Sequence, residues 1–130
     1  MNRRVVVTGL GMVTPLGLDA ATTWAGLVSG RSGTRTITQF EPEGFPSKVA
    51  GEVKGFDPTS FMERKEARRT DRFTQFTFAA ADEAVQQANY LALEDGRKAA
   101  AIIGTALGGI HSMEREYDVL RERGPRRVSP

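Results

Sequence analysis

The stretch RRVVVTGLG, residues 3–11, decides the fold class of this chain. Residues 3–8 form a short run rich in β-branched side chains that the next two glycines stop, a pattern typical of a buried strand followed by a tight turn. Asp19 is a favoured N-cap for the helical pattern that follows, and Gly30 stands where a left-handed helix end would fall. The chain is therefore predicted to open with a strand, a loop and a helix.

The same order is repeated near the other end of the chain. Residues 98–103, KAAAII, predict a second buried strand, and the glycine loop at 104–109 leads into a predicted helix over 110–123. The residues expected on the inner face of this helix are Ile110, Met113, Tyr117 and Leu120. Strands joined by helical crossovers imply a parallel sheet, so the fold class is α/β.

Residues 32–58 lie between these units and predict an irregular excursion with brief strands at 36–38 and 49–53. A long helix follows, for which Asp71 is a candidate N-cap. Its expected packing face consists of Phe73, Phe76, Ala80, Ala84 and Ala88. No boundary or repeat divides the chain, so we expect one domain over residues 1–130. It is expected to be incomplete, because a buried parallel sheet usually has more strands than the three or four readable here.

Composition excludes several kinds of site. The 130 residues contain no cysteine, so we expect no disulfide, no thiolate catalysis and no cysteine-rich metal site. His111 is the single histidine, and no Gly-x-Ser-x-Gly elbow accompanies it. No run approaches the roughly 20 apolar residues that span a membrane, and the first apolar run is too short for a signal peptide. We therefore expect a soluble cytoplasmic protein without a metal or cofactor.

Two glycine loops match phosphate-binding motifs only in part. TGLGMVT at 8–14 follows a predicted strand, as the dinucleotide fingerprint does, but Thr14 replaces the last glycine and no acidic residue stands about 20 positions later. The loop GTALGG has the glycine spacing of a P-loop, but Ile110 and His111 stand where lysine and a hydroxyl residue are required. We favour a tight turn in the first loop, and a nucleotide-binding protein is a minor alternative. His111 is interpreted as an exposed helix residue, since no catalytic partner can be named.

Cations gather in two stretches, although the net charge is only +2. RKEARRTDRFTQF, residues 64–76, contains five cations, and residues 63–72 contain three carboxylates. Residues 121–127 contain four arginines and one glutamate. Taken alone, each stretch is interpreted first as a solvated face, with a nucleic-acid surface and a contact for an acidic protein as the alternatives. Nucleic acid would favour stacking aromatics among the charges, whereas Phe73 and Phe76 fit the packed helix face.

Four segments together resemble the amino-terminal part of a β-ketoacyl-acyl carrier protein synthase. They are VVVTGLGMVTPLG at 5–17, RKEARRTDRFTQF at 64–76, IIGTALGG at 102–109 and GPRRVSP at 124–130. The elongating synthases I and II of fatty-acid biosynthesis are most similar, synthase II above all, and the ketosynthases of aromatic polyketide pathways come next. The resemblance covers this whole chain but only the early part of the family's much longer sequence.

The resemblance implies a thiolase-like α/β fold, in which two similar layered halves form one subunit and two subunits form a homodimer. This chain would supply the N-terminal part of the first half. The implied reaction is a decarboxylative Claisen condensation, with a cysteine nucleophile and two histidines that support decarboxylation and the oxyanion. None of these three residues is expected within the chain. We therefore expect no catalytic residue before Pro130 and no activity from the fragment alone.

The resemblance also gives the basic stretches a partner, the family's acidic acyl carrier protein. The carrier-contacting residues that match by motif are Lys65, Arg68 and Arg69, with Arg126 and Arg127 as a second cluster. Such charges orient docking more than they tighten it. Arg64 and Arg72 are open to a structural role instead. Leu107, in GTALGG, resembles the residue that lines the acyl-chain pocket, although an ordinary core leucine explains it equally well.

Two alternatives remain open at this point. The chain also resembles polyketide ketosynthases, and the sequence distinguishes neither the pathway nor the acyl chain length. The second alternative is a non-catalytic module that uses its basic face to hold a carrier protein or another acidic partner. Neither requires a nucleic-acid or membrane partner.

Overall fold

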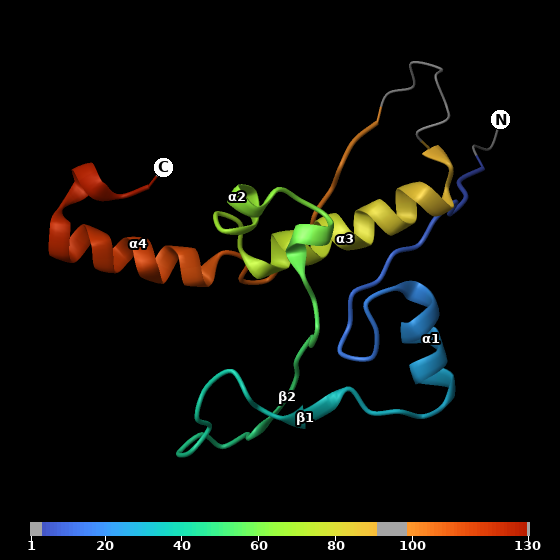
Figure 1. Ribbon diagram of the computed structural model, residues 1–130, viewed down its shortest axis with the longest axis horizontal. Helices are drawn as coiled ribbons and strands as arrows, with labels where there is room; N and C mark the ends of the chain where they lie inside the picture. The colour runs from blue at the N-terminus through green and yellow to red at the C-terminus, as the bar shows by residue number, and fades with distance from the viewer. Residues whose placement is uncertain (1–3, 91–98, 130) are drawn as a thin grey trace.

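The computed structural model describes residues 4–90 and 99–129, and a long helix, α3 (Arg72–Gln87), runs through its middle (Figure 1). The amino-terminal segment and α1 (Ala20–Val28) lie along one end of α3. From the other end α4 (Ile110–Arg123) leads away, and η3 (Pro125–Arg127) folds back beside it. The short η1 (Pro58–Ser60) and α2 (Arg64–Ala67) lie beside the start of α3.

The first helix begins and ends as the sequence predicts. The Asp19 carboxylate accepts a hydrogen bond from the Thr22 backbone N–H at 2.6 Å, which satisfies one of the free donors at the start of α1. Gly30, two residues beyond the helix, has a φ of 68°. Both predicted ends of this helix are confirmed.

The excursion after α1 contains the brief strands expected there, with the first one displaced by two residues. Strands β1 (Thr34–Thr36) and β2 (Val49–Gly51) pair antiparallel, with Arg35 opposite Ala50. Beyond β2, the Glu52 carboxylate accepts hydrogen bonds from the Thr38 N–H at 2.9 Å and the Thr38 hydroxyl at 2.8 Å. These bonds join the segment that follows β1 to the segment that follows β2.

The hairpin should lose this link in acid. Hydrogen bonds from the Thr38 N–H and hydroxyl lower the pKa of Glu52 from 4.5 to about 2. Because the folded-state pKa lies below the unfolded one, the stabilisation is present above pH 4.5 and is lost as the pH falls from 4.5 to about 2. Wild type should therefore melt at a higher temperature than Glu52→Gln at pH 6, with the difference shrinking across that window. A difference in melting temperature that stays constant down to pH 2.5 would contradict this.

The two buried strands predicted at 3–8 and 98–103 are not formed as strands in the described part of the chain. Residues 3 and 98 lie outside the described residues, and the remainder of both runs has no ladder partner among them. Val5 is 92% exposed and Ile102 is 95% exposed. A strand exists only through hydrogen bonds to a neighbour. The sequence therefore predicted the local preference of these runs, but no neighbouring strand pairs with them here.

Helix α3 supplies most of the packing that the described residues contain. Ala79 is 3% exposed and Gln75 is 8% exposed, while the expected face from Phe73 to Ala88 is half-buried. At the start of the helix, the Arg72 guanidinium lies 4.8 Å from the centre of the Phe76 ring and donates to the Val53 carbonyl at 3.1 Å. Arg72 thus has a structural role, one of the two readings that its sequence position allowed.

Helix α4 has the predicted bounds, but the prediction of a packed inner face is wrong for the described structure. Met113 is 71% exposed, and the other three residues of that face are exposed as well. Among the described elements, α4 packs mainly on η3, so no other element covers this stripe. Within residues 4–90 and 99–129, no helix combines the length and apolar character needed to cross a membrane.

Candidate functional site

The first glycine loop is packed against the backbone of α3. A Cβ on Gly9 would lie 2.9 Å from the carbonyl carbon of Ala84, and one on Gly11 would lie 2.6 Å from the carbonyl carbon of Ala80. Real Cβ atoms do not approach backbone atoms this closely. These glycines are therefore explained by close helix packing, as in the tight turn that the sequence favoured.

Two backbone donors of the same loop are already used. Leu10 donates its N–H to the Gln87 side chain at 2.6 Å, and Met12 donates to the Glu83 carboxylate at 2.9 Å. Glu83 also accepts from the Ala20 N–H, at the start of α1, at 2.8 Å. A phosphate site would need such donors free and no carboxylate beside them. The geometry thus argues against a nucleotide site in the first loop.

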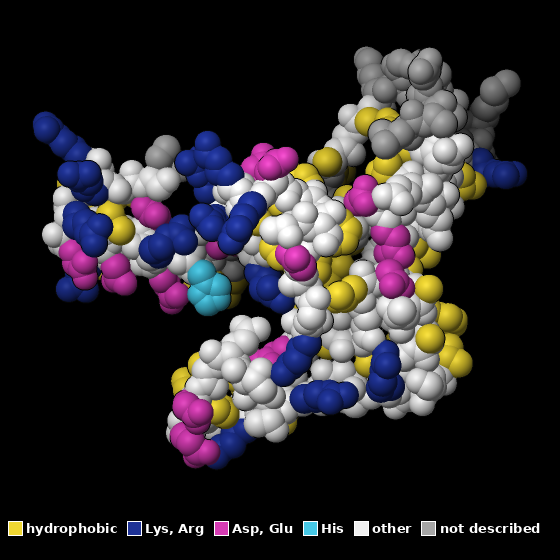
Figure 2. Space-filling model, in the orientation of Figure 1, with side chains coloured by type: hydrophobic (Ala, Val, Ile, Leu, Met, Phe, Trp, Pro, Cys, Tyr) yellow, Lys and Arg dark blue, Asp and Glu magenta, His cyan; other side chains and the backbone are white. Residues whose placement is uncertain are grey.

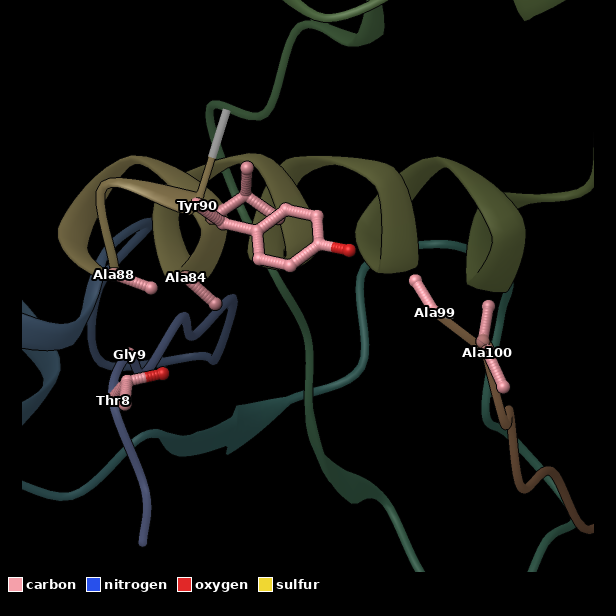
Figure 3. A pocket seen from close by; sticks show the side chains of 9 residues that line it. Thr8, Gly9, Ala84, Ala88, Tyr90, Ala99 and Ala100 are labelled. Atoms are coloured by element: carbon pink, nitrogen blue, oxygen red, sulfur yellow. The ribbon is translucent and has the colours of Figure 1, made fainter. Parts of the chain in front are cut away.

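A cavity of about 570 Å³ lies between the amino-terminal segment, α3 and residues 99–101 (Figure 3). Ala84 in α3 and Ala88, the residue that follows the helix, point toward Thr8 and Gly9, and the Tyr90 ring lies beside them. The lining offers only the hydroxyls of Thr8 and Tyr90 as side-chain polar groups. It contains neither a carboxylate nor an imidazole, so the cavity has no acid–base or metal-binding chemistry.

The predicted first basic cluster, Lys65, Arg68 and Arg69, lies on α2 and the turn that follows it, and all three side chains are exposed. No ion pair joins them to a carboxylate within the described residues. Gln75, a buried residue of α3, holds this turn in place. Its amide donates to the Ala67 carbonyl at 2.8 Å and to the Thr70 carbonyl at 3.1 Å. The three cations are therefore held on an ordered backbone while their charges stay in solvent.

The predicted second cluster, Arg126 and Arg127, lies on η3, and both side chains are exposed. Gly124 ends α4 with a φ of 79° and a ψ of 169°, a conformation that is open almost only to glycine. This turn folds η3 back beside α4 (Figure 1). Figure 2 shows lysine and arginine side chains gathered over α2 and over the unit of α4 and η3.

A side-chain hydrogen bond joins α3, which follows the first cluster in the chain, to α4, which precedes the second. The Ser112 hydroxyl, in the first turn of α4, donates to the Asp71 carboxylate at 2.8 Å. Asp71 stands at the N-cap position of α3, as predicted, but its side chain makes no capping bond there. The predicted capping bond is therefore absent, and the carboxylate instead connects α3 with α4.

The second glycine loop places Leu107 at this same junction. A Cβ on Gly108 would lie 2.9 Å from the Phe73 ring, so the loop passes closely over the start of α3. Leu107 itself is 75% exposed, which excludes an ordinary core leucine within the described structure. His111, in the next turn, is also exposed and lies 3.8 Å from Glu114, as expected of a surface helix residue. No group of side chains in residues 4–90 and 99–129 could hold a metal ion.

Gln75 and Glu116 make hydrogen bonds near the two clusters, and neither was among the site residues predicted from the sequence. Gln75 is a polar residue four positions before Ala79, so its place on the buried face of α3 could have been inferred from helical spacing. Glu116 accepts a hydrogen bond from the Ser129 N–H at 2.7 Å, across a turn. No local sequence pattern signals that contact, since it depends on how Gly124 redirects the chain.

Comparisons with known proteins identify the family of this chain. Residues 2–130 match the family model described as "Beta-ketoacyl synthase, N-terminal domain". The chain is 41% identical over 130 residues to the 3-oxoacyl-[acyl-carrier-protein] synthase 2 of Synechocystis sp. and 40% identical to that of Coxiella burnetii. Each alignment covers 99% of this chain and 31% of the relative, so the chain spans about a third of these proteins.

A solved structure gives the same result. The ishigamide ketosynthase/chain length factor superposes with a TM-score of 0.80 and 34% sequence identity, over 100% of this chain and 33% of that one. The chain thus has the N-terminal part of the first half of a thiolase-like α/β fold. Together, the family match and these relatives show that the chain belongs to the β-ketoacyl synthase family, within its N-terminal domain.

Proposed function

We propose that this chain is the carrier-docking part of a 3-oxoacyl-[acyl-carrier-protein] synthase of type II, which elongates acyl chains in fatty-acid biosynthesis. The observation that carries the proposal is the pair of exposed cation clusters on ordered turns, Lys65, Arg68 and Arg69 on one element and Arg126 and Arg127 on the other. The names of the curated relatives, at about 41% identity, support the carrier protein as the partner.

The reaction proposed for the whole enzyme is a decarboxylative Claisen condensation. A malonyl thioester on the carrier protein loses carbon dioxide, and the resulting carbanion attacks an acyl thioester carbonyl and expels its thiolate. The chain contains no cysteine, and its one histidine, His111, is exposed. Its proposed contribution is therefore binding and orientation of the carrier, without a bond-making residue.

The clusters suit a partner that must leave after each cycle. Exposed charges contribute little affinity individually but raise the association rate and orient the encounter. An acidic carrier protein would meet two cation clusters held on separate elements, which fixes its rotation on the surface. Since neither cluster is buried, salt should weaken the contact steeply.

Leu107 is proposed to line the acyl-chain pocket. Its exposed aliphatic side chain stands on a loop that packs against Phe73 and leads directly into α4. A wall of that kind needs an apolar side chain on a fixed backbone, and this loop supplies both. A homodimer and a cytoplasmic location belong to the same proposal.

Charge reversal tests the docking proposal. In the full-length protein, Lys65→Glu, Arg68→Glu and Arg69→Glu combined should weaken binding of a holo acyl carrier protein by about 10- to 100-fold at low salt. Arg126→Glu with Arg127→Glu should act in the same direction. Affinity and association rate are measured by surface plasmon resonance between low and physiological salt.

The matched control reverses two cations elsewhere. Arg35→Glu with Lys48→Glu makes the same change of charge as the Arg126 and Arg127 pair, but on the hairpin, which lies apart from both clusters in Figure 1. The control variant should bind the carrier protein more tightly than the cluster variants do. If control and cluster variants lose the same affinity, or if no charge reversal changes the affinity, the docking assignment is wrong.

A further inference from the structure

The geometry points to Glu116 as a positioning residue for the second basic cluster: we propose that its hydrogen bond to the Ser129 N–H fixes Arg126 and Arg127 for the carrier protein. The inference rests on the docking function proposed above and identifies what orders that site. Glu116 itself is not placed in contact with the carrier. Its effect would be transmitted through the backbone of η3.

The contact closes a loop around the two arginines. Gly124 turns the chain at the end of α4, and the Ser129 N–H reaches back to the Glu116 carboxylate at 2.7 Å. The segment between these two points contains η3 and both arginines. The hydrogen bond therefore fixes the far end of a short segment whose near end is already fixed by the helix.

The carboxylate is well suited to this task. The Ser129 N–H is the main cause that lowers the pKa of Glu116, so the group stays ionised and remains an acceptor at neutral pH. Charge-assisted bonds of this kind are shorter and stronger than neutral ones. The other carboxylate oxygen lies 3.4 Å from Arg115 Nε, which gives Glu116 a second, cationic neighbour.

The same polar chain continues toward the first cluster. Arg115 lies 3.4 Å from the Ser112 hydroxyl, and Ser112 donates to the Asp71 carboxylate at 2.8 Å. Asp71 follows the turn that carries Arg68 and Arg69 within two residues. A continuous series of polar contacts thus runs from Asp71 to Ser129, between the two clusters. It restrains the position of one cluster relative to the other.

The test compares two variants that change charge equally. Glu116→Ala removes the acceptor, whereas Glu116→Gln removes the same charge and keeps an amide oxygen for the Ser129 N–H. In the full-length protein, Glu116→Ala should weaken holo acyl carrier protein binding by about three- to tenfold, the effect of losing one solvent-exposed hydrogen bond. Glu116→Gln should bind within about twofold of wild type.

Glu114→Ala and Glu114→Gln are the matched controls, because Glu114 is exposed on the same helix and its carboxylate lies near His111. Both should bind the carrier as wild type does or slightly better, since each removes a negative charge near the arginines. Equal carrier affinity for Glu116→Ala and Glu116→Gln would overturn the proposal, because charge alone would then explain the result.

Hydrogen exchange separates this proposal from the docking function. Without any carrier protein, amide exchange in a peptide covering residues 124–129 should accelerate in Glu116→Ala and stay slow in Glu116→Gln. Unchanged exchange in Glu116→Ala would overturn the role of Glu116 even if docking stands. Accelerated exchange with no effect on carrier binding from Arg126→Glu and Arg127→Glu would instead overturn docking by this cluster, and with it the functional part of the inference.

Discussion

Replacing Gly11 by alanine should displace the amino-terminal segment from α3 and lower the free energy of unfolding by about 3 to 5 kcal/mol. The new Cβ would overlap the Ala80 carbonyl group and lie 3.0 Å from the Ala80 Cα. These are backbone atoms inside a helix, so they cannot turn aside as a flexible side chain would. The segment itself must move, and its hydrogen bonds to Gln87 and Glu83 would be lost with it.

Chemical denaturation of the full-length protein measures this loss, with Gly104→Ala as the matched control. Gly104 has a φ outside the left-handed region, and a Cβ there would meet no atom within 4 Å. The control should therefore stay within about 0.5 kcal/mol of wild type. A Gly11→Ala variant as stable as the Gly104→Ala variant would show that the segment does not pack on α3 as described.

The glycine positions also show how far the sequence could lead. The glycines at residues 9 and 11 predicted a tight turn, and in the structure both lie in close contact with α3. The partner could not be inferred, because Ala80 and Ala84 lie about 70 residues later and a small helix residue resembles any other. Glycine in one element and alanine in another permit close approach, but only the fold shows which elements meet.

Helices with local signals were predicted well. Asp19 and Gly30 bound α1, and α4 has the predicted limits because a glycine precedes it and another follows it. Strands with non-local requirements were not. The run VVV at 5–7 has a strong strand preference, yet strand formation needs a hydrogen-bonded neighbour, and none lies beside it among the described residues.

The candidate site also combines features that the local sequence predicts with contacts that it does not predict. Exposure of Lys65, Arg68 and Arg69 follows from charge, which a sequence displays directly. Charge does not predict the contacts that hold this turn and η3. The Gln75 amide donates to carbonyls five and eight residues earlier, and the Glu116 carboxylate accepts from a backbone N–H 13 residues later. Residue type therefore predicts an exposed charged surface more readily than it predicts the residues whose contacts hold that surface in place.

Removing the Glu83 carboxylate should have the second large effect: Glu83→Ala should lower the free energy of unfolding by about 2 to 4 kcal/mol. Its oxygens accept from the Met12 N–H at 2.9 Å and from the Ala20 N–H at 2.8 and 3.1 Å. The second contact also places a negative charge at the N-terminus of α1, where the helix dipole favours it. Alanine would leave both half-buried donors without this partner.

Glu83→Gln should lower the free energy of unfolding by about half as much, because the amide oxygen can accept from one backbone N–H while the amide nitrogen cannot accept from the other. Asp82→Ala is the control, since the neighbouring Asp82 is exposed and its carboxylate contacts the Gln86 side chain on the same helix. It should change the free energy of unfolding by less than about 0.5 kcal/mol. A Glu83→Ala variant as stable as this control would mean that water replaces the carboxylate at no cost.

The Gly11→Ala and Glu83→Ala changes should not be additive. Gly11→Ala moves the segment that carries the Met12 N–H, so a carboxylate at position 83 has one donor fewer to satisfy afterwards. In a double-mutant cycle, the second change should therefore cost about 1 kcal/mol less than it does in wild type. Additive losses would mean that Glu83 acts only through α1. A coupling energy of the expected size would show that one contact region on α3 holds both the amino-terminal segment and α1.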